Sequence, residues 1–169
     1  MKYVGIDNGL NGGIVLLNED GIVIDTFNMP VLKMEKTEYD IKGIVTILKG
    51  IYNSYEYGTV KVYLEKAHVR PVQGIRAAFT TGFGLGIMEG ILESLGLSYE
   101  VVNPTVWMKS VFEGNYSKEN KKYSMIFAQR KWPNTEWHKG KNIHDGLTDA
   151  ACIGYYGYLK NKGVVKNDS

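Results

Sequence analysis

Short apolar runs separated by polar reversals cover the first thirty positions and predict three successive β-strands. The runs are residues 3–6, 13–17 and 22–27. A glycine-rich turn joins the first two, and an Asn-Glu-Asp-Gly reversal, which is a strong hairpin signal, joins the second to the third. The pattern therefore predicts an antiparallel meander whose first strand ends in Asp7, followed by a polar connection at residues 31–39.

A crossover to a parallel strand follows the meander. Apolar residues at helical spacing after Asp40, a suitable N-cap, predict a helix, and an apolar run at residues 60–64 ends in Glu65. A helix between two strands implies a crossover, so we expect the strand at residues 60–64 to lie parallel to the first strand. Asp7 and Glu65 would then lie close together at the carboxyl edge of the sheet, where open α/β sheets place their sites.

A long helix is predicted at residues 74–95, and small residues follow one of its faces. Ala78, Gly82, Gly86 and Gly90 recur every four positions. Glycine weakens a helix, and the usual reason for a stripe of glycine is the close approach of another backbone. The sheet and a second copy of the chain both fit this role, and the sequence leaves the two open.

In the second half of the chain, the pattern of apolar and polar residues predicts one more strand and three more helices in an α/β arrangement. We expect a loop at residues 134–143, and a single domain over residues 1–163 with a frayed tail at residues 164–169. The predicted elements are a strand at residues 98–102, a helix opening with Asn103-Pro104-Thr105, a helix from Ser117 to about Lys131, and a final helix that begins at His144 or Asp145.

The composition is that of an ordinary globular protein. The 169 residues are 44% apolar and 22% charged, and the single cysteine, Cys152, excludes an internal disulfide. No apolar segment approaches the ~18–20 residues that span a bilayer, and no leader pattern opens the chain. We therefore expect a cytoplasmic protein with no membrane partner. The phosphate-binding patterns G-x-G-x-x-G and G-x-x-x-x-G-K-[ST] are absent, so we expect no nucleotide cofactor.

A basic block lies within a chain whose net charge is only +2. Residues 1–100 carry 9 Lys or Arg against 12 Asp or Glu, whereas residues 101–143 carry 8 against 3. Such a block is typical of a face that binds a polyanion. A lysine-rich helix face exposed to solvent explains it equally well, and the totals do not decide between the two.

Four acidic residues are candidates for one metal centre. Asp7 has no neighbouring Lys or Arg in the sequence, and a buried carboxylate needs a positive partner; an Asx-turn that closes its own loop is the alternative. Asp145 and Asp149 share one helix face. Capping of the helix N-terminus is sufficient to explain Asp145, but it does not explain Asp149. Together with Glu65 they form an all-oxygen set that suits Mg²⁺ or Mn²⁺, and two such ions activate water in phosphodiester hydrolysis.

Six stretches, taken in their order and spacing, carry a family resemblance. They are Gly5-Ile6-Asp7-Asn8-Gly9, Leu64-Glu65-Lys66, residues 74–90, Asn103-Pro104-Thr105-Val106-Trp107-Met108-Lys109, Ser117-Lys118-Glu119-Asn120-Lys121 and Asp149-Ala150-Ala151. Over about residues 2–160 the chain resembles the ribonuclease H-like nucleases, and more narrowly the RuvC-type Holliday-junction resolvases with their phage and poxvirus relatives. The resemblance implies a ribonuclease H-like fold: a mixed five-stranded sheet, three antiparallel strands and then parallel ones, flanked by helices.

The resemblance also implies a metal-dependent homodimer that nicks two strands of a four-way DNA junction. It makes Asp7, Glu65 and Asp149 ligands of two Mg²⁺ ions in each active site, with Mn²⁺ as a substitute, and the predicted helix at residues 74–95 is a candidate dimer interface. The family's last two acids are three apart, whereas here they are four apart. Asp145 is the favoured fourth ligand and His144 the alternative; a capping or surface role for His144 stays open.

Basic residues of the chain match family positions near the cut phosphates. Lys109 and Lys118 occupy two such positions and are candidate catalytic residues, with solvent-exposed helix lysines as the alternative. The third position after Glu65, an aromatic residue in the family that inserts at the crossover, is His68 here. The candidate DNA-binding residues are His68, Arg70, Arg76, Lys109, Lys118, Lys121 and Lys122.

The leading functional hypothesis is a crossover junction endodeoxyribonuclease that resolves four-way and other branched DNA by paired nicks. A ribonuclease H-like nuclease acting on another nucleic acid, such as an RNA–DNA hybrid or a flap, is the first alternative. A non-catalytic protein that binds branched DNA is the second. The four acids count against the second alternative, because a binding module gains nothing from carboxylates placed against phosphate.

Overall fold

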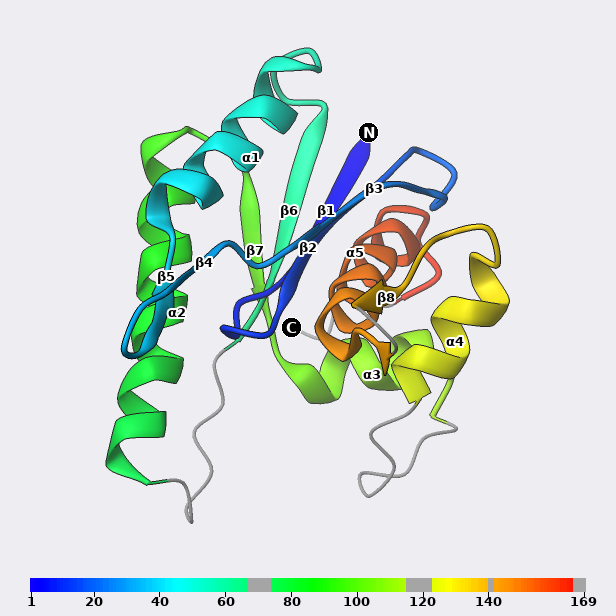
Figure 1. The fold of residues 1–169 in the computed structure, drawn as a ribbon. Coiled ribbons are helices and arrows are strands. Elements are labelled where there is room, and N and C mark those ends of the chain that lie inside the picture. The colour runs from blue at the N-terminus through cyan, green and yellow to red at the C-terminus, as the bar shows by residue number, and fades with distance from the viewer. Residues whose placement is uncertain (67–73, 115–122, 140–141, 166–169) are drawn as a thin grey trace.

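A five-stranded sheet forms the centre of the molecule, and helices cover both of its faces (Figure 1). The computed structural model describes residues 1–66, 74–114, 123–139 and 142–165. The strand order is β3-β2-β1-β6-β7. These strands are β1 (Lys2–Asp7), β2 (Gly13–Leu17), β3 (Val23–Asn28), β6 (Val60–Glu65) and β7 (Tyr99–Val102).

The sheet is mixed, as the sequence predicted. β1 pairs antiparallel with β2, and β2 with β3, whereas β6 lies parallel to β1 and β7 parallel to β6. The parallel register sets Ile6 opposite Leu64. Asp7 and Glu65, each one residue further on, therefore leave the sheet side by side at the same edge. The predicted meander and crossover are both confirmed.

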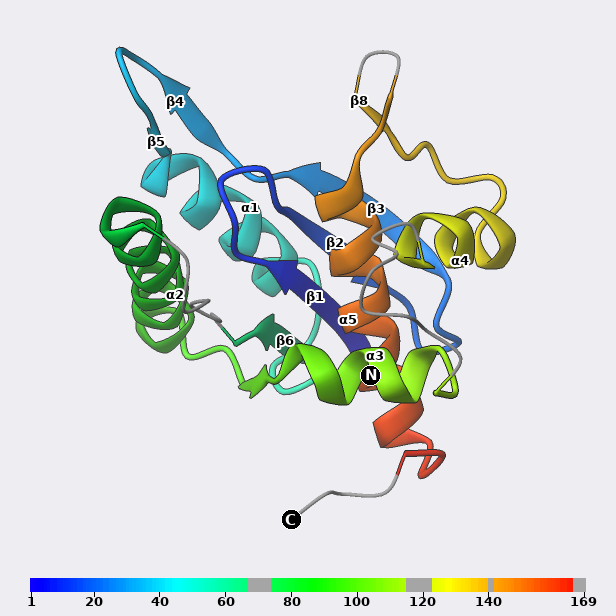
Figure 2. The same ribbon diagram turned by 90° about the horizontal axis from the view of Figure 1, so that it is seen from below.

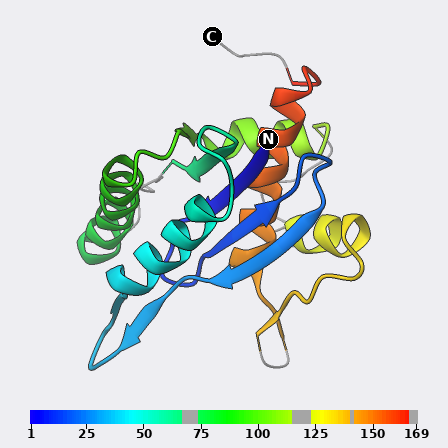
Figure 3. The ribbon, with the colours of Figure 1, turned by 90° about the horizontal axis from the view of Figure 1, so that it is seen from above.

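Two helices lie on one face of the sheet and three on the other (Figures 1 and 3). Asp40 caps the first helix as expected, and its side chain accepts a hydrogen bond from the amide of Gly43 at 3.0 Å. On one face lie α1 (Ile41–Asn53) and α2 (Ile75–Ser94); on the other lie α3 (Pro104–Val111), α4 (Tyr123–Lys131) and α5 (Asp145–Asn161). Among the described residues, no helix is long and apolar enough to cross a membrane.

Alternation along β1 divides its side chains between two cores. Val4 and Ile6 belong to the core under α1 and α2, whereas Tyr3 belongs to the core under α3, α4 and α5. Because successive side chains point to opposite faces of a strand, Gly5 and Asp7 share the face of Tyr3. The strand therefore directs Asp7 toward α5.

Glycine allows α5 to lie directly on β1. A Cβ at Gly5 would overlap the carbonyl oxygen of Ala150 and the backbone of Gly154. A Cβ at Gly146, in the first turn of α5, would overlap the carbonyl oxygen of Asn11 in the loop after β1. Such contact between backbones is open only to glycine, and it fixes the helix at two points beside the end of β1.

Two segments that the sequence assigned to loops contain short β-ladders. Residues 31–39, predicted as a polar connection, form a hairpin of β4 (Val31–Lys33) and β5 (Thr37–Tyr39), and residues 134–143 include β8 (His138–Lys139) and β9 (Asn142–Ile143). These strands are two or three residues long, too short for an alternation to be visible in the sequence. Tyr39, which is only 8% exposed, anchors the first hairpin to the core.

The small-residue stripe on α2 faces away from the sheet. Beyond the helix's own backbone, a Cβ added at Gly82, Gly86 or Gly90 would meet no atom of the described residues within 4 Å, so packing on the sheet does not explain these three glycines. It is Gly84 that contacts the rest of the molecule, against the Tyr39 hydroxyl and the Asn8 carbonyl. The predicted start of α4 at Ser117 lies outside the described residues.

Candidate metal centre

Two carboxylates reach the candidate centre from adjacent parallel strands. Asp7 ends β1 and Glu65 ends β6, and each follows the face of a tyrosine, Tyr3 or Tyr63, that packs in the core under α5. Both carboxylates therefore lie on the α5 side of the sheet. Figure 2 looks onto this edge from below, with α2 on one side of it and α5 on the other.

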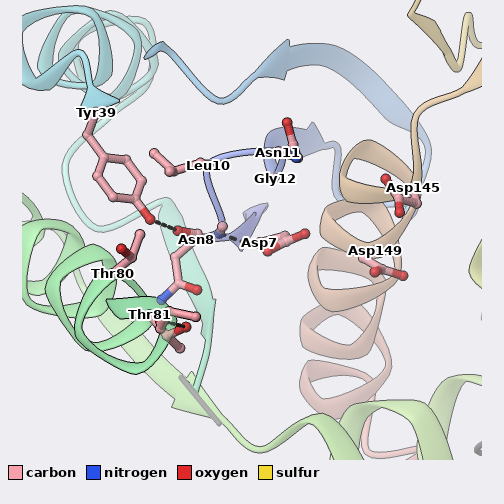
Figure 4. Close-up of a pocket in the computed structure, with 12 residues that line it drawn as sticks. Asp7, Asn8, Leu10, Asn11, Gly12, Tyr39, Thr80, Thr81, Asp145 and Asp149 are labelled. Atoms are coloured by element: carbon pink, nitrogen blue, oxygen red, sulfur yellow. Dashed lines mark hydrogen bonds between the residues drawn. The ribbon is translucent and has the colours of Figure 1, made fainter. Parts of the chain in front are cut away.

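The other two carboxylates come from the first two turns of α5. Asp145 is the first residue of the helix and Asp149 lies one turn further on, so both occupy one face. The Asp7 side chain points toward both of them (Figure 4). Together with nine other residues, these three acids line an open pocket of about 510 Å³: Asn8, Gly9, Leu10, Asn11, Gly12, Tyr39, Ala77, Thr80 and Thr81.

Burial strongly perturbs three of the four acids. Burial, with a smaller effect from Asp145, raises the pKa of Asp7 from 3.8 to about 6. Burial also raises the pKa of Asp149 from 3.8 to about 7, and the charges of Asp7 and Asp145 add to the effect. The pKa of Glu65 rises from 4.5 to about 8, mainly through burial and then through the charge of Asp7. The four groups thus form one repulsive electrostatic cluster.

Neutral donors hold these partly buried carboxylates. The amide of Gly9 donates to Asp7 Oδ1 at 3.0 Å, the Asx-turn that the sequence offered as the alternative for this residue. The indole of Trp107 donates to Glu65 Oε1 at 3.0 Å, and the Ser124 side chain bonds to Asp149. No ion pair joins any of the four acids to a Lys or Arg within the described parts of the chain.

A divalent cation suits this set of donors. Carboxylate oxygens are the ligands that Mg²⁺ and Mn²⁺ prefer, and repulsive buried acids without a cationic partner gain most from such an ion. Among the described residues, no three or more His, Cys, Asp or Glu side chains already have the arrangement of a metal site. An ion would therefore have to draw the carboxylates closer together.

His144 caps the helix that carries the last two acids. It is 5% exposed, and its Nδ1 accepts the amide hydrogen of Leu147 at 3.1 Å. Asp145, by contrast, is exposed and lines the pocket. The cap accounts for His144 and leaves Asp145 as the better candidate for the fourth ligand.

Few of the predicted DNA-binding residues can be placed. Lys109 is exposed in the last turn of α3, and Arg76 is exposed in the first turn of α2. The other predicted positions lie outside the described residues: His68, Arg70, Lys118, Lys121 and Lys122.

Three residues near the acids carry contacts that sequence reasoning did not assign. Asn8, 7% exposed, donates from Nδ2 to the backbone carbonyl of Glu65 at 3.4 Å, and so links the ends of β1 and β6. The Tyr39 hydroxyl donates to the Asn8 carbonyl at 2.8 Å (Figure 4). Trp107 holds the Glu65 carboxylate. Of these three residues, only Trp107 could have been singled out from the sequence, because it places an indole N–H on an otherwise apolar helix face.

Two of the solved structures that resemble this chain match nearly the whole of it. Thermus thermophilus RuvC in complex with a Holliday junction substrate matches with a TM-score of 0.65 at 13% identity, over 98% of this chain and 99% of that one. A second Thermus thermophilus RuvC structure matches with a TM-score of 0.64 at 16% identity over the same shares. No protein-family model and no curated protein matches. The chain therefore has the ribonuclease H-like fold in the form that RuvC takes.

Proposed function

We propose that the chain is a metal-dependent endonuclease that resolves four-way (Holliday) and other branched DNA junctions by paired nicks. The observation that carries the proposal is the cluster of Asp7, Glu65, Asp145 and Asp149 at one edge of a RuvC-like sheet, without a cationic partner among the described residues. The fold likeness to RuvC, one structure of which contains a junction, supports the choice of substrate.

In this proposal the four carboxylates hold two Mg²⁺ ions, for which Mn²⁺ substitutes. When bound, two such ions would supply the activation of a water and the stabilisation of the leaving oxygen in phosphodiester hydrolysis. Asp7 and Glu65 are positioned by the strand ends, and Asp149 and Asp145 by the docking of α5 on β1. The Gly9 amide and the Trp107 indole orient the carboxylates without neutralising them.

Basic residues of the chain would contact the DNA backbone. We assign Lys109, together with Lys118, to the phosphates near the cut, and the remaining predicted basic residues to the arms of the junction. Contacts of this kind release counterions, so binding should weaken steeply as salt rises.

A homodimer would match the two-fold symmetry of a four-way junction. The exposed face of α2 is the candidate interface, because Gly82, Gly86 and Gly90 leave its backbone open to a second helix. Phe79 is 69% exposed and Phe83 52% exposed on the same helix, and such side chains favour an interface.

Cleavage of a synthetic four-way junction tests the proposal. The junction is incubated with Mg²⁺ or EDTA beside linear duplex, Y-fork and RNA–DNA hybrid. Paired, metal-dependent nicks in the junction are expected. Equal cutting of forks would widen the activity to debranching, preferential cutting of the hybrid would favour the ribonuclease H-like alternative, and tight binding without cleavage in Mg²⁺ or Mn²⁺ would contradict the proposal.

Replacement of one acid separates catalysis from binding. Asp7→Asn should abolish cleavage and leave junction binding and folding intact, because the amide keeps the shape of the side chain and cannot replace a carboxylate ligand. Asp25→Asn is the matched control, since Asp25 is exposed on β3 and bonds only to the adjacent Thr26 amide among the contacts identified. Equal loss of cleavage and binding in Asp7→Asn, with folding unchanged, would argue against a metal role for Asp7.

A further inference from the structure

Trp107 is the buried residue that contacts the Glu65 carboxylate. Its side chain is 2% exposed, and its indole Nε1–H donates to Glu65 Oε1 at 3.0 Å. The strand pairing explains how it arrives there. Val102 at the end of β7 pairs with Glu65, Asn103 caps α3, and one turn of that helix carries Trp107 back over the strand end. The β7–α3 connection therefore delivers the indole to the candidate metal centre.

The other two tryptophans make hydrogen bonds of a different kind. The chain has three tryptophans. Trp132 donates its Nε1–H to the backbone carbonyl of Gly21 at 2.9 Å, and Trp137 donates to the carbonyl of Trp132 at 3.4 Å. A backbone carbonyl is already fixed by the chain, so these two bonds satisfy a buried donor and position nothing further. The Trp107 bond instead fixes a rotatable carboxylate.

The chemistry of the donor suits a site that binds a cation. A Lys or Arg partner would neutralise Glu65 and compete with a metal ion, whereas an indole N–H orients the carboxylate and leaves its charge in place. The indole engages one oxygen of Glu65, and no hydrogen bond from a described residue engages the other. Hydrogen-bond partners of this kind typically affect metal affinity or activity by about 10–100-fold when they are removed.

We infer that Trp107 is a positioning residue, whose indole N–H holds Glu65 Oε1 so that Glu65 Oε2 is presented to the metal ions. The inference rests on the proposed function, since it deepens the account of the same site. It goes beyond a packing role, in which Trp107 would matter only through the core that it shares with Phe112, at 5.9 Å between ring centroids.

A pair of matched variants distinguishes positioning from packing. Trp107→Phe and Trp132→Phe each remove one buried indole N–H from the same core and keep an aromatic ring. We expect Trp107→Phe to weaken Mn²⁺ binding, measured by calorimetry, by about 10–100-fold, and to lower kcat for junction cleavage with little change in KM. Trp132→Phe should leave metal binding unchanged. Equal effects of the two variants, or no effect of either, would overturn the inference.

The unmodified protein supplies a second test that does not depend on how the variants fold. Each of the three indole N–H groups gives one signal in a ¹H–¹⁵N spectrum, and triple-resonance and NOE spectra of the unmodified protein assign them. During a Mg²⁺ titration the Trp107 signal should shift along the binding curve, while the Trp132 and Trp137 signals stay in place. Metal binding with no shift at Trp107 would overturn the positioning role and leave the metal centre intact. No metal binding at all by the unmodified protein would instead overturn the proposed metal centre, and the positioning role with it.

Discussion

Asp7, Glu65 and Asp149 are partly buried carboxylic acids with raised pKa values, and their desolvation makes the metal-free protein sensitive to pH. Their pKa values are about 6, about 8 and about 7 in the folded protein, against 3.8, 4.5 and 3.8 for the ordinary side chains. At pH values between the ordinary and the raised pKa values, these carboxyl groups keep their protons in the folded protein and have lost them in the unfolded chain. Stability from this source is complete below about pH 4 and disappears as pH rises through the folded values.

We therefore predict that the metal-free protein becomes less stable as pH rises. In EDTA, the free energy of unfolding should fall by several kcal/mol between about pH 5 and about pH 9, measured by urea denaturation. Glu65→Gln should flatten this dependence, because the amide does not ionise. Mg²⁺ should oppose the loss at high pH. A free energy of unfolding that rises across this window would contradict the burial of these acids.

The sequence predicted where the acids meet and missed what holds them. Strand parity and the parallel crossover were enough to bring Asp7 and Glu65 to one edge, and the four-residue spacing put Asp145 and Asp149 on one helix face. The contact of Trp107 with Glu65 depends on how a helix packs over a strand end. No local pattern in the sequence encodes that packing, so this contact needed the structure.

At the scale of elements, the contact between α5 and β1 determines the geometry of the site. Gly5→Ala would place a methyl group inside the backbone of α5, and overpacking of a core costs about 1–3 kcal/mol or more. We predict a loss of at least about 3 kcal/mol in the free energy of unfolding, measured by denaturant titration, together with loss of cleavage.

Gly50 provides the control for this prediction. It lies in α1, and beyond the helix's own backbone an added Cβ would meet no atom of the described residues within 4 Å. Gly50→Ala should raise the free energy of unfolding by about 0.5–1 kcal/mol, because alanine favours a helix over the unfolded chain. Similar effects of the two substitutions would show that α5 does not lie directly on β1.

Helix ends were more predictable than short strands. Asp40 and Asn103 cap α1 and α3 through their own side chains, which is a local interaction that the sequence reveals. The β4–β5 hairpin was missed because its main anchor, Tyr39, packs against α2 and the β1 loop rather than against its own strand partners. Its stability comes from tertiary contacts, and these leave no periodic pattern in the sequence.

At the scale of the whole molecule, the basic block at residues 101–143 should make DNA binding depend on salt. Lys109→Ala removes one exposed charge from the last turn of α3. If Lys109 contacts a phosphate, the slope of log affinity against log salt for a four-way junction should fall by about 1, as measured by fluorescence anisotropy. Lys49→Ala is the control. Lys49 is exposed on α1, on the opposite face of the sheet from α3, so its removal should leave the slope unchanged. Equal slopes for both variants would remove Lys109 from the interface.

The glycine face of α2 allows the proposed dimer to be tested by the addition of side chains. At Gly86 an added Cβ meets no atom of the described residues within 4 Å beyond its own helix backbone, so in a monomer Gly86→Gln should be at least neutral for folding. In a dimer that packs α2 against α2 through this face, the same glutamine would separate the two backbones. We predict that sedimentation equilibrium finds the unmodified protein and Gly50→Gln as dimers and Gly86→Gln as a monomer that remains folded. A dimer of unchanged affinity in Gly86→Gln would exclude this face, and the two active sites needed for paired nicks would then have to meet through another surface.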